Sequence, residues 1–203
     1  MSNILQVNLP TPSSSLISEV NGFLDGLEFD PDKKRWLDEF NGGKINSVLH
    51  YFDSPDWLTE SIRRDYQHLF PLHQLGGMIG VMENSGDAPG CLPPHIDRSR
   101  ALGVNYFLEL GGSAVRTVFY DREEPIIGKS YNITYDEVNV VEENISTNGW
   151  YCYNVRRCHS VENIETRRVF IAIRLVRKDL AEDKDFEYSI DHFKADYPDL
   201  LVK

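Results

Sequence analysis

A succession of short β-prone runs between residues 74 and 177 is the feature that most constrains this fold. The runs are rich in β-branched and aromatic residues, and Gly, Pro, Asn or Asp separate them, as is typical of strands joined by turns. They cover residues 75–83, 102–110, 114–120, 131–141, 149–154 and 168–176. This pattern predicts an all-β sandwich or barrel, with a hairpin turn at Glu109–Ser113.

The segments on either side are predicted to be mainly helical. Ser13–Ser15 precede a helical face of apolar residues, and Ser54 followed by Pro55 is typical of a capped helix start. A further short helix is expected around Trp36 and Phe40, a strand over residues 45–52, and a last helix around Tyr188–Phe193. We expect one domain over residues 1–203: a mainly helical extension with one strand (1–73), the β core (74–177) and a helical tail (178–203).

Composition narrows the classes of function. The formal charge is −11, so the protein repels phosphate backbones and nucleic acid is a poor candidate partner. No signal peptide and no apolar run of membrane-spanning length is found, which indicates a cytoplasmic protein with no membrane partner. Cys91, Cys152 and Cys158 have no spacing that predicts a disulfide or a zinc site.

Two sequence features point to a site. His95 and Asp97 are two positions apart, so on a strand they face the same side, and His159 could complete a set of two histidines and one carboxylate. This is the usual ligand set of non-haem Fe(II) oxygenases. In the run that starts at Arg168, a purely aliphatic face should pack on helices, while Arg168 points into the barrel and needs an anionic partner there.

Around these residues the chain resembles the 2-oxoglutarate/Fe(II)-dependent dioxygenase superfamily, over roughly residues 75–176. Residues 94–108 (PHIDRSRALGVNYFL) are similar to its His-x-Asp loop running into the next strand. Residues 149–154 (GWYCYN) followed by His159 are similar to its later strand pair. The resemblance implies a double-stranded β-helix, or jelly roll: a mainly β (α+β) fold with N-terminal helices packed on one sheet and a short C-terminal helix.

The resemblance also implies the cofactors. Fe(II) on His95, Asp97 and His159 would bind 2-oxoglutarate and dioxygen, with succinate and carbon dioxide as products. Arg168, nine positions beyond His159, stands where the superfamily places the residue that pairs with the far carboxylate of 2-oxoglutarate. We prefer it to Arg167, because facing Arg168 inward leaves the aliphatic face unbroken.

Other positions are less clearly placed. Phe170 stands where many relatives have a serine that also contacts 2-oxoglutarate, so the pocket is one hydroxyl short. Asn105 and Tyr106 are candidate cosubstrate contacts, of which only one can face inward. Arg98 and Arg100 flank the metal loop and are candidate contacts to an acidic substrate.

These features predict a 2-oxoglutarate-dependent oxygenase, with an amino acid, a protein side chain or a small metabolite as its substrate. Two alternatives stay open. One is a cupin-like metal enzyme that does not use 2-oxoglutarate and would therefore not require an arginine at position 168. The other is a non-catalytic jelly-roll module for protein or sugar binding, which would bind no Fe(II) or Mn(II).

Overall fold

The computed structural model describes residues 2–27, 48–84, 87–97, 102–123, 138–178 and 188–202. In chain order the strands are β1 (Ile4–Val7), β2 (Val48–Asp53), β3 (His73–Asn84), β4 (Gly90–His95), β5 (Leu102–Leu110), β6 (Arg116–Glu123), β7 (Val140–Ile145), β8 (Trp150–Asn154), β9 (Arg157–Ile164) and β10 (Arg168–Arg177). The helices are α1 (Ser14–Asp25), α3 (Asp56–Tyr66) and α4 (Ile190–Asp196), with short 3₁₀ turns η2 (Gln67–Leu69) and η5 (Pro198–Leu200). No helix in these ranges combines the length and the apolar character that a bilayer span requires.

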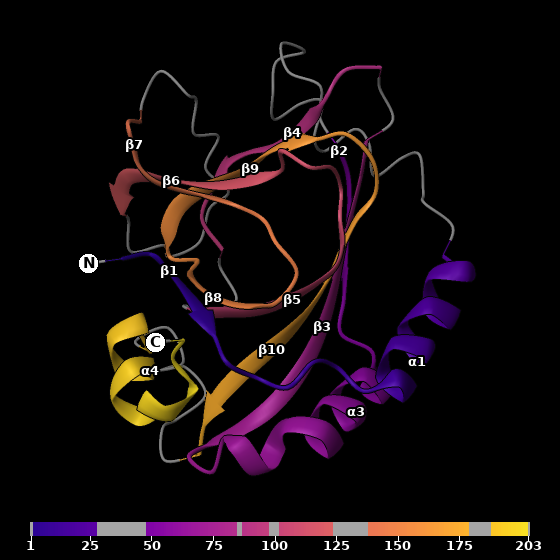
Figure 1. The fold of residues 1–203 in the computed structure, drawn as a ribbon, viewed down its shortest axis with the longest axis vertical. Helices are drawn as coiled ribbons and strands as arrows, with labels where there is room; N and C mark the ends of the chain where they lie inside the picture. The colour runs from indigo at the N-terminus through magenta and orange to yellow at the C-terminus, as the bar shows by residue number, and fades with distance from the viewer. Residues whose placement is uncertain are drawn as a thin grey trace.

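The strands form two antiparallel sheets that face each other (Figure 1). The larger sheet has the order β1-β8-β5-β10-β3-β2, and the smaller one has the order β4-β9-β6-β7. From β3 to β10 the chain passes from one sheet to the other at every step except between β6 and β7. This winding is that of a double-stranded β-helix and confirms the predicted fold class, while β1 and β2 extend the larger sheet at its two edges.

Strand β10 shows how the sequence divides the core into two layers. Val169, Ile171 and Ile173 are fully buried among the residues that face the helices. Phe170 and Ala172 point the other way, into the core between the sheets. The alternation along the strand therefore places its aliphatic face against the helices, as expected.

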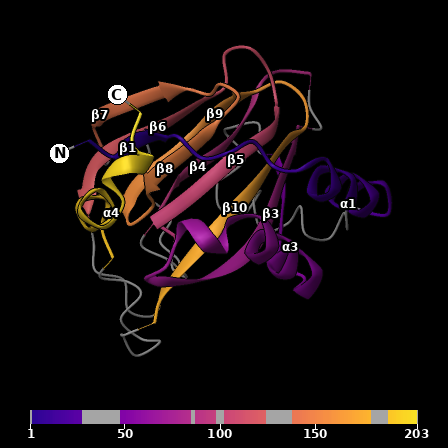
Figure 2. The ribbon, with the colours of Figure 1, turned by 60° about the horizontal axis from the view of Figure 1, so that its bottom comes forward.

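Helices α1 and α3 cover the outer face of the larger sheet, close to β3 and β10 (Figure 2). Ser13 caps α1 as predicted, because its side chain accepts a hydrogen bond of 3.2 Å from the Leu16 amide. Helix α3 sits so close to β3 that a Cβ added at Gly77 would lie 2.8 Å from Cγ of Leu58 and 2.9 Å from its carbonyl carbon. A glycine at this position lets the helix approach the sheet.

Several local predictions need correction. Helix α3 begins at Asp56, with Pro55 in the cap position and no side-chain cap, so Ser54 does not cap it. Residues 109–113 do not form a hairpin turn, because β5 and β6 belong to different sheets. The predicted β-prone runs include none of β1, β4 and β9, of which β9 was expected only from the resemblance. Strand β7 begins near the end of the predicted run over residues 131–141, and the predicted helix around Trp36 lies outside the described residues.

Candidate metal centre

Strands β4 and β9 bring three possible metal ligands together at one end of the smaller sheet. His95 ends β4 and is the cross-strand partner of His159 on β9, and Asp97 follows two residues after His95. One ligand atom from each of the three side chains lies within 4.8 Å of the other two. The two imidazole centroids are 4.3 Å apart, and His95 Nε2 is 3.6 Å from Asp97 Oδ1.

An irregularity in β4 is what turns His95 inward. Leu92 pairs with Val161 and His95 pairs with His159, so three steps along β4 match two steps along β9. Without this extra residue, positions 92 and 95 would lie on opposite faces of the strand. The residues between them are Pro93 and Pro94, which have no amide hydrogen to donate to a regular ladder.

Backbone carbonyls orient both histidines in the same way. Nδ1 of His95 lies 2.8 Å from the Pro93 carbonyl oxygen, and Nδ1 of His159 lies 2.9 Å from that of Arg157. A carbonyl can only accept, so each Nδ1 must carry a proton, and in the neutral imidazole the lone pair is then on Nε2. This arrangement is the usual outer support of a metal-binding histidine.

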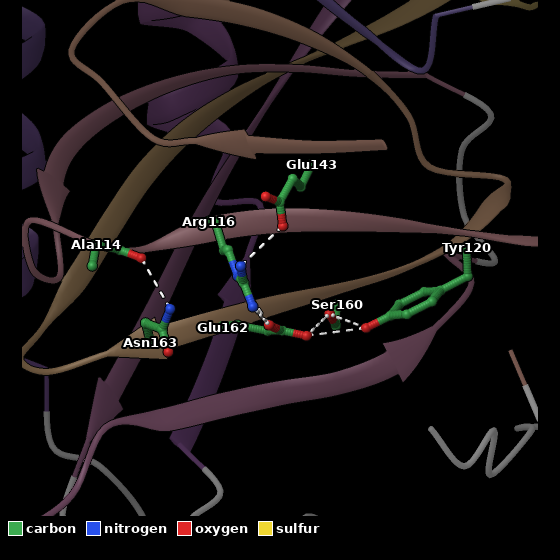
Figure 3. Close-up of polar contacts among 7 residues, drawn as sticks. All are labelled: Ala114, Arg116, Tyr120, Glu143, Ser160, Glu162 and Asn163. Atoms are coloured by element: carbon green, nitrogen blue, oxygen red, sulfur yellow. Dashed lines mark hydrogen bonds and ion pairs between the residues drawn. The ribbon is translucent and has the colours of Figure 1, made fainter. Parts of the chain in front are cut away.

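The outer face of the smaller sheet holds β9 in register through a polar network (Figure 3). The Arg116 guanidinium on β6 donates to the Glu162 carboxylate on β9 at 3.1 and 2.9 Å. The Tyr120 hydroxyl, also on β6, lies 2.9 Å from Ser160 Oγ and donates to Glu162 at 3.0 Å. Because Ser160 and Glu162 point outward, the same register turns His159 inward.

The three candidate ligands line a cavity between the sheets, which encloses about 450 Å³ including its opening. Side chains from both sheets form its wall: Met82, Leu92, His95, Asp97, Asn105, Phe107, Thr117, Tyr153, Val155, His159, Val161, Arg168 and Phe170.

Among the described residues, Arg168 is the only lysine or arginine in this wall, and it is only 1% exposed. Its guanidinium donates to the Leu110 carbonyl at 3.1 Å and to Ser146 Oγ at 2.9 Å, and it lies 4.1 Å from the centre of the Phe107 ring. Within the described ranges no carboxylate forms an ion pair with it. Burial lowers the pKa of Arg168 to about 10, so the side chain is still charged at neutral pH.

Its neighbour Arg167 points away from the cavity. It is 42% exposed and forms an ion pair of 2.6 Å with Glu109. The turn after β5 makes room for Arg168: Gly111 has a φ of +83°, and a Cβ there would lie 2.9 Å from Arg168 Cβ. Gly111 therefore serves the packing of an arginine and not a hairpin.

The remaining candidates divide as follows. Asn105 lines the cavity, whereas Tyr106 is on the opposite face of β5 and packs against Trp150, with ring centroids 5.3 Å apart. The structure thus does not bring Tyr106 to the cavity, since consecutive strand residues face opposite sides. Arg98 and Arg100 lie outside the described residues. Sequence reasoning did not single out Thr117 or Ser146, and no spacing in the chain could have placed them here.

Comparison with known proteins assigns this chain to no family. No family model and no curated protein matches the chain. Similar solved structures include a Pseudomonas putida prolyl-4-hydroxylase (10% identity, 86% of this chain, 91% of that chain, TM-score 0.38). Another is E. coli ycfD, with 13% identity over 61% of this chain and 31% of that chain and a TM-score of 0.37. A third is the Solanum melongena vicilin, with 11% identity over 67% of this chain and 30% of that chain and a TM-score of 0.35. The chain thus spans about a third of the length of ycfD and of the vicilin. At these scores the neighbours assign no function. The chain itself has a jelly-roll fold and a His-Asp-His group that could hold a metal ion.

Proposed function

We propose that this protein is an Fe(II)- and 2-oxoglutarate-dependent oxygenase. One observation carries the proposal: the candidate ligands and a buried arginine line the same cavity, and no carboxylate in the described residues pairs with that arginine. A metal site alone would not require the arginine. A structural arginine would be expected to have an acidic partner, since a buried unpaired charge is costly.

The donor set suits Fe(II). Two imidazole nitrogens and one carboxylate oxygen, all from one end of a sheet, leave other coordination positions open. With the Nδ1 protons of both histidines directed to the carbonyls of Pro93 and Arg157, Nε2 is the atom through which each histidine would bind the ion. The hydrogen bond of 3.0 Å from the Asp97 amide to the Val155 carbonyl keeps the carboxylate on the same side.

The cavity also suits 2-oxoglutarate. Its far carboxylate would meet Arg168, while its 2-oxo acid end would face the metal ligands. When bound, iron, 2-oxoglutarate and dioxygen would together supply the oxidation of a substrate C–H bond, with one oxygen atom going to the substrate and the other to succinate, and carbon dioxide released. The chain contributes the ligands, the charge that orients the cosubstrate, and the apolar wall of Met82, Leu92 and Val161 that limits water.

For the substrate we propose an amino acid, a protein side chain or a small metabolite, hydroxylated in the cytoplasm. Arg98 and Arg100 lie one and three positions after Asp97 in the sequence and remain our candidates for contacts to an acidic substrate. The formal charge of −11 disfavours a nucleic acid in this role.

A binding titration followed by an activity assay tests the proposal. Mn(II) and Fe(II) are titrated under anaerobic conditions, 2-oxoglutarate is then added, and succinate release is measured with ascorbate across amino acids, peptides and nucleotides. We expect metal-dependent binding of 2-oxoglutarate and succinate release. Metal binding without 2-oxoglutarate binding would instead identify a cupin-like metal enzyme, and the absence of metal binding would leave a jelly-roll binding module.

A further inference from the structure

Phe119 on β6 belongs to the same row of inward-facing side chains as the two candidate histidine ligands. His159 is the cross-strand partner of His95 on one side and of Phe119 on the other, so the three residues lie at one level across three neighbouring strands. The Phe119 side chain is fully buried, and it is not among the residues that line the cavity. Phe119 therefore lies behind His159, where it contacts the imidazole but not a molecule bound in the cavity.

The Phe119 ring is held between the two sheets. Its centroid is 5.6 Å from that of the His159 imidazole, and the two ring planes are 27° apart. On its other side it lies 6.3 Å from the ring of Tyr153 on β8, with the planes 18° apart. Both contacts are stacked, and Tyr153 is itself buried in the opposite sheet. The phenyl ring thus gives the imidazole a flat surface whose position both sheets fix.

The imidazole of His159 needs such a surface. Its Nδ1 lies 2.9 Å from the Arg157 carbonyl oxygen, but hydrogen bonds tolerate a range of angles, so this bond alone lets the ring plane tilt. An ion shared with His95 and Asp97 requires Nε2 to point at one place, because ligand distances in metal sites vary by only about 0.2 Å. A ring packed against the face of the imidazole resists the tilt.

The charge distribution of the phenyl ring also favours the metal-bound state. A divalent cation draws electron density from the imidazole that binds it and leaves that ring more positive. The face of a phenyl ring is negative and attracts positive charge that lies over it. Leucine fills much of the same volume, but it has neither the flat face nor this charge distribution.

We propose that Phe119 is a positioning residue for the metal centre: its ring holds the His159 imidazole with Nε2 directed at the ion and stabilises the metal-bound form of that imidazole. This inference rests on the metal-binding part of the proposed function and does not depend on 2-oxoglutarate. It holds equally for a cupin-like metal enzyme.

Titration of the wild type and of Phe119→Leu with Mn(II), without dioxygen, tests this role. Aromatic contacts of this kind change an equilibrium by about 3- to 10-fold, so the dissociation constant for Mn(II) should rise by about that factor. The electron paramagnetic resonance spectrum of the bound Mn(II) should broaden, because His159 is less firmly oriented. Urea denaturation of the metal-free proteins measures the change in folding stability separately. If the leucine variant does not fold, Phe119→Met provides the same comparison with a more adaptable side chain.

Phe70→Leu is the matched control. Phe70 is equally buried and packs edge-on against Tyr197, with ring centroids 5.0 Å apart, in the core layer that faces the helices. The same chemical change there should lower the free energy of unfolding and leave the Mn(II) dissociation constant and spectrum unchanged.

The outcomes separate this inference from the proposed function. If the Phe119 variant binds Mn(II) as tightly as the wild type and with the same spectrum, Phe119 serves packing alone; the inference is overturned and the proposed function stands. Equal weakening of Mn(II) binding in Phe70→Leu would also overturn it, since that indicates a general effect of core substitutions. If the wild type binds no Mn(II), the inference and the proposed function fail together.

Discussion

Replacing Arg168 by methionine asks whether this buried cation serves the fold or a ligand. In the unliganded protein its contributions to stability oppose each other. Lowering its pKa from 12.5 to about 10 by burial corresponds to a cost of roughly 3 kcal/mol, at about 1.4 kcal/mol per pH unit. Its hydrogen bonds to the Leu110 carbonyl and Ser146, at about 1.5 kcal/mol each, offset most of this cost.

The expected result follows from this near-balance. Methionine has a similar length and can pack against Phe107 and Phe170, which both line the cavity. We therefore expect Arg168→Met to change the free energy of unfolding of the metal-free protein by no more than about 1–2 kcal/mol. The same change should weaken 2-oxoglutarate binding by about 2–5 kcal/mol, the scale for removing one partner of a desolvated charge pair.

Urea denaturation without ligands measures the first quantity, and calorimetry on the Mn(II)-loaded protein measures the second. Arg167→Met is the control, because its exposed ion pair with Glu109 should contribute less than about 1 kcal/mol and does not face the cavity. A loss of more than about 3 kcal/mol of stability in Arg168→Met would show that the arginine is structural. Unchanged affinity for 2-oxoglutarate would refute a carboxylate beside it.

Three further changes test other parts of the structure. His159→Ala should remove the stabilisation by Mn(II), which for a single site is about 2.7 kcal/mol at 100 times Kd; a thermal shift that persists would exclude His159 as a ligand. Gly77→Ala should lower the free energy of unfolding by about 1–3 kcal/mol, because the new methyl group meets the Leu58 backbone; an unchanged denaturation midpoint would contradict the close packing seen here. Burial raises the pKa of Asp65, but its hydrogen bond of 2.6 Å from Ser13 and its other polar contacts outweigh this and leave the pKa below 3.8. The stabilisation by this hydrogen bond is therefore present above about pH 4 and is lost as the pH falls through the lowered pKa. Ser13→Ala should lower the free energy of unfolding at neutral pH by about 1–2 kcal/mol, and the difference from the wild type should become smaller in acid. A difference in the free energy of unfolding that does not depend on pH would argue against this hydrogen bond.

The sequence predicted the fold where side-chain alternation was strong. Strand β10 is the best example, because its aliphatic residues could face only an apolar layer, and this placed Arg168 on the inner face. Strand β4 was missed as a separate element, since Pro93 and Pro94 argue against a regular strand. Strand β1 was missed because four residues carry too little periodicity, and its position depends on pairing with β8.

The site was only partly predictable for a related reason. His95, Asp97 and Arg168 belong to local patterns that can be read along the chain. Tyr153 and Thr117, which line the same cavity, belong to different sheets, so only the packing of the two sheets brings them together, and no local spacing encodes this. The choice between Asn105 and Tyr106 likewise required knowing which face of β5 meets the helices.

The cross-strand pairing of His95 with His159 has a mechanical consequence. Strand β4 is at the edge of the smaller sheet and β9 is its neighbour there, so an ion bound by both imidazoles would fasten the outermost strand to the rest of the sheet. Metal binding would then suppress local unfolding of that edge. The amide protons of β4 should therefore exchange with solvent more slowly than those of the opposite edge strand, β7. In such a protein, loss of the ion and local unfolding of the β4 edge would occur together.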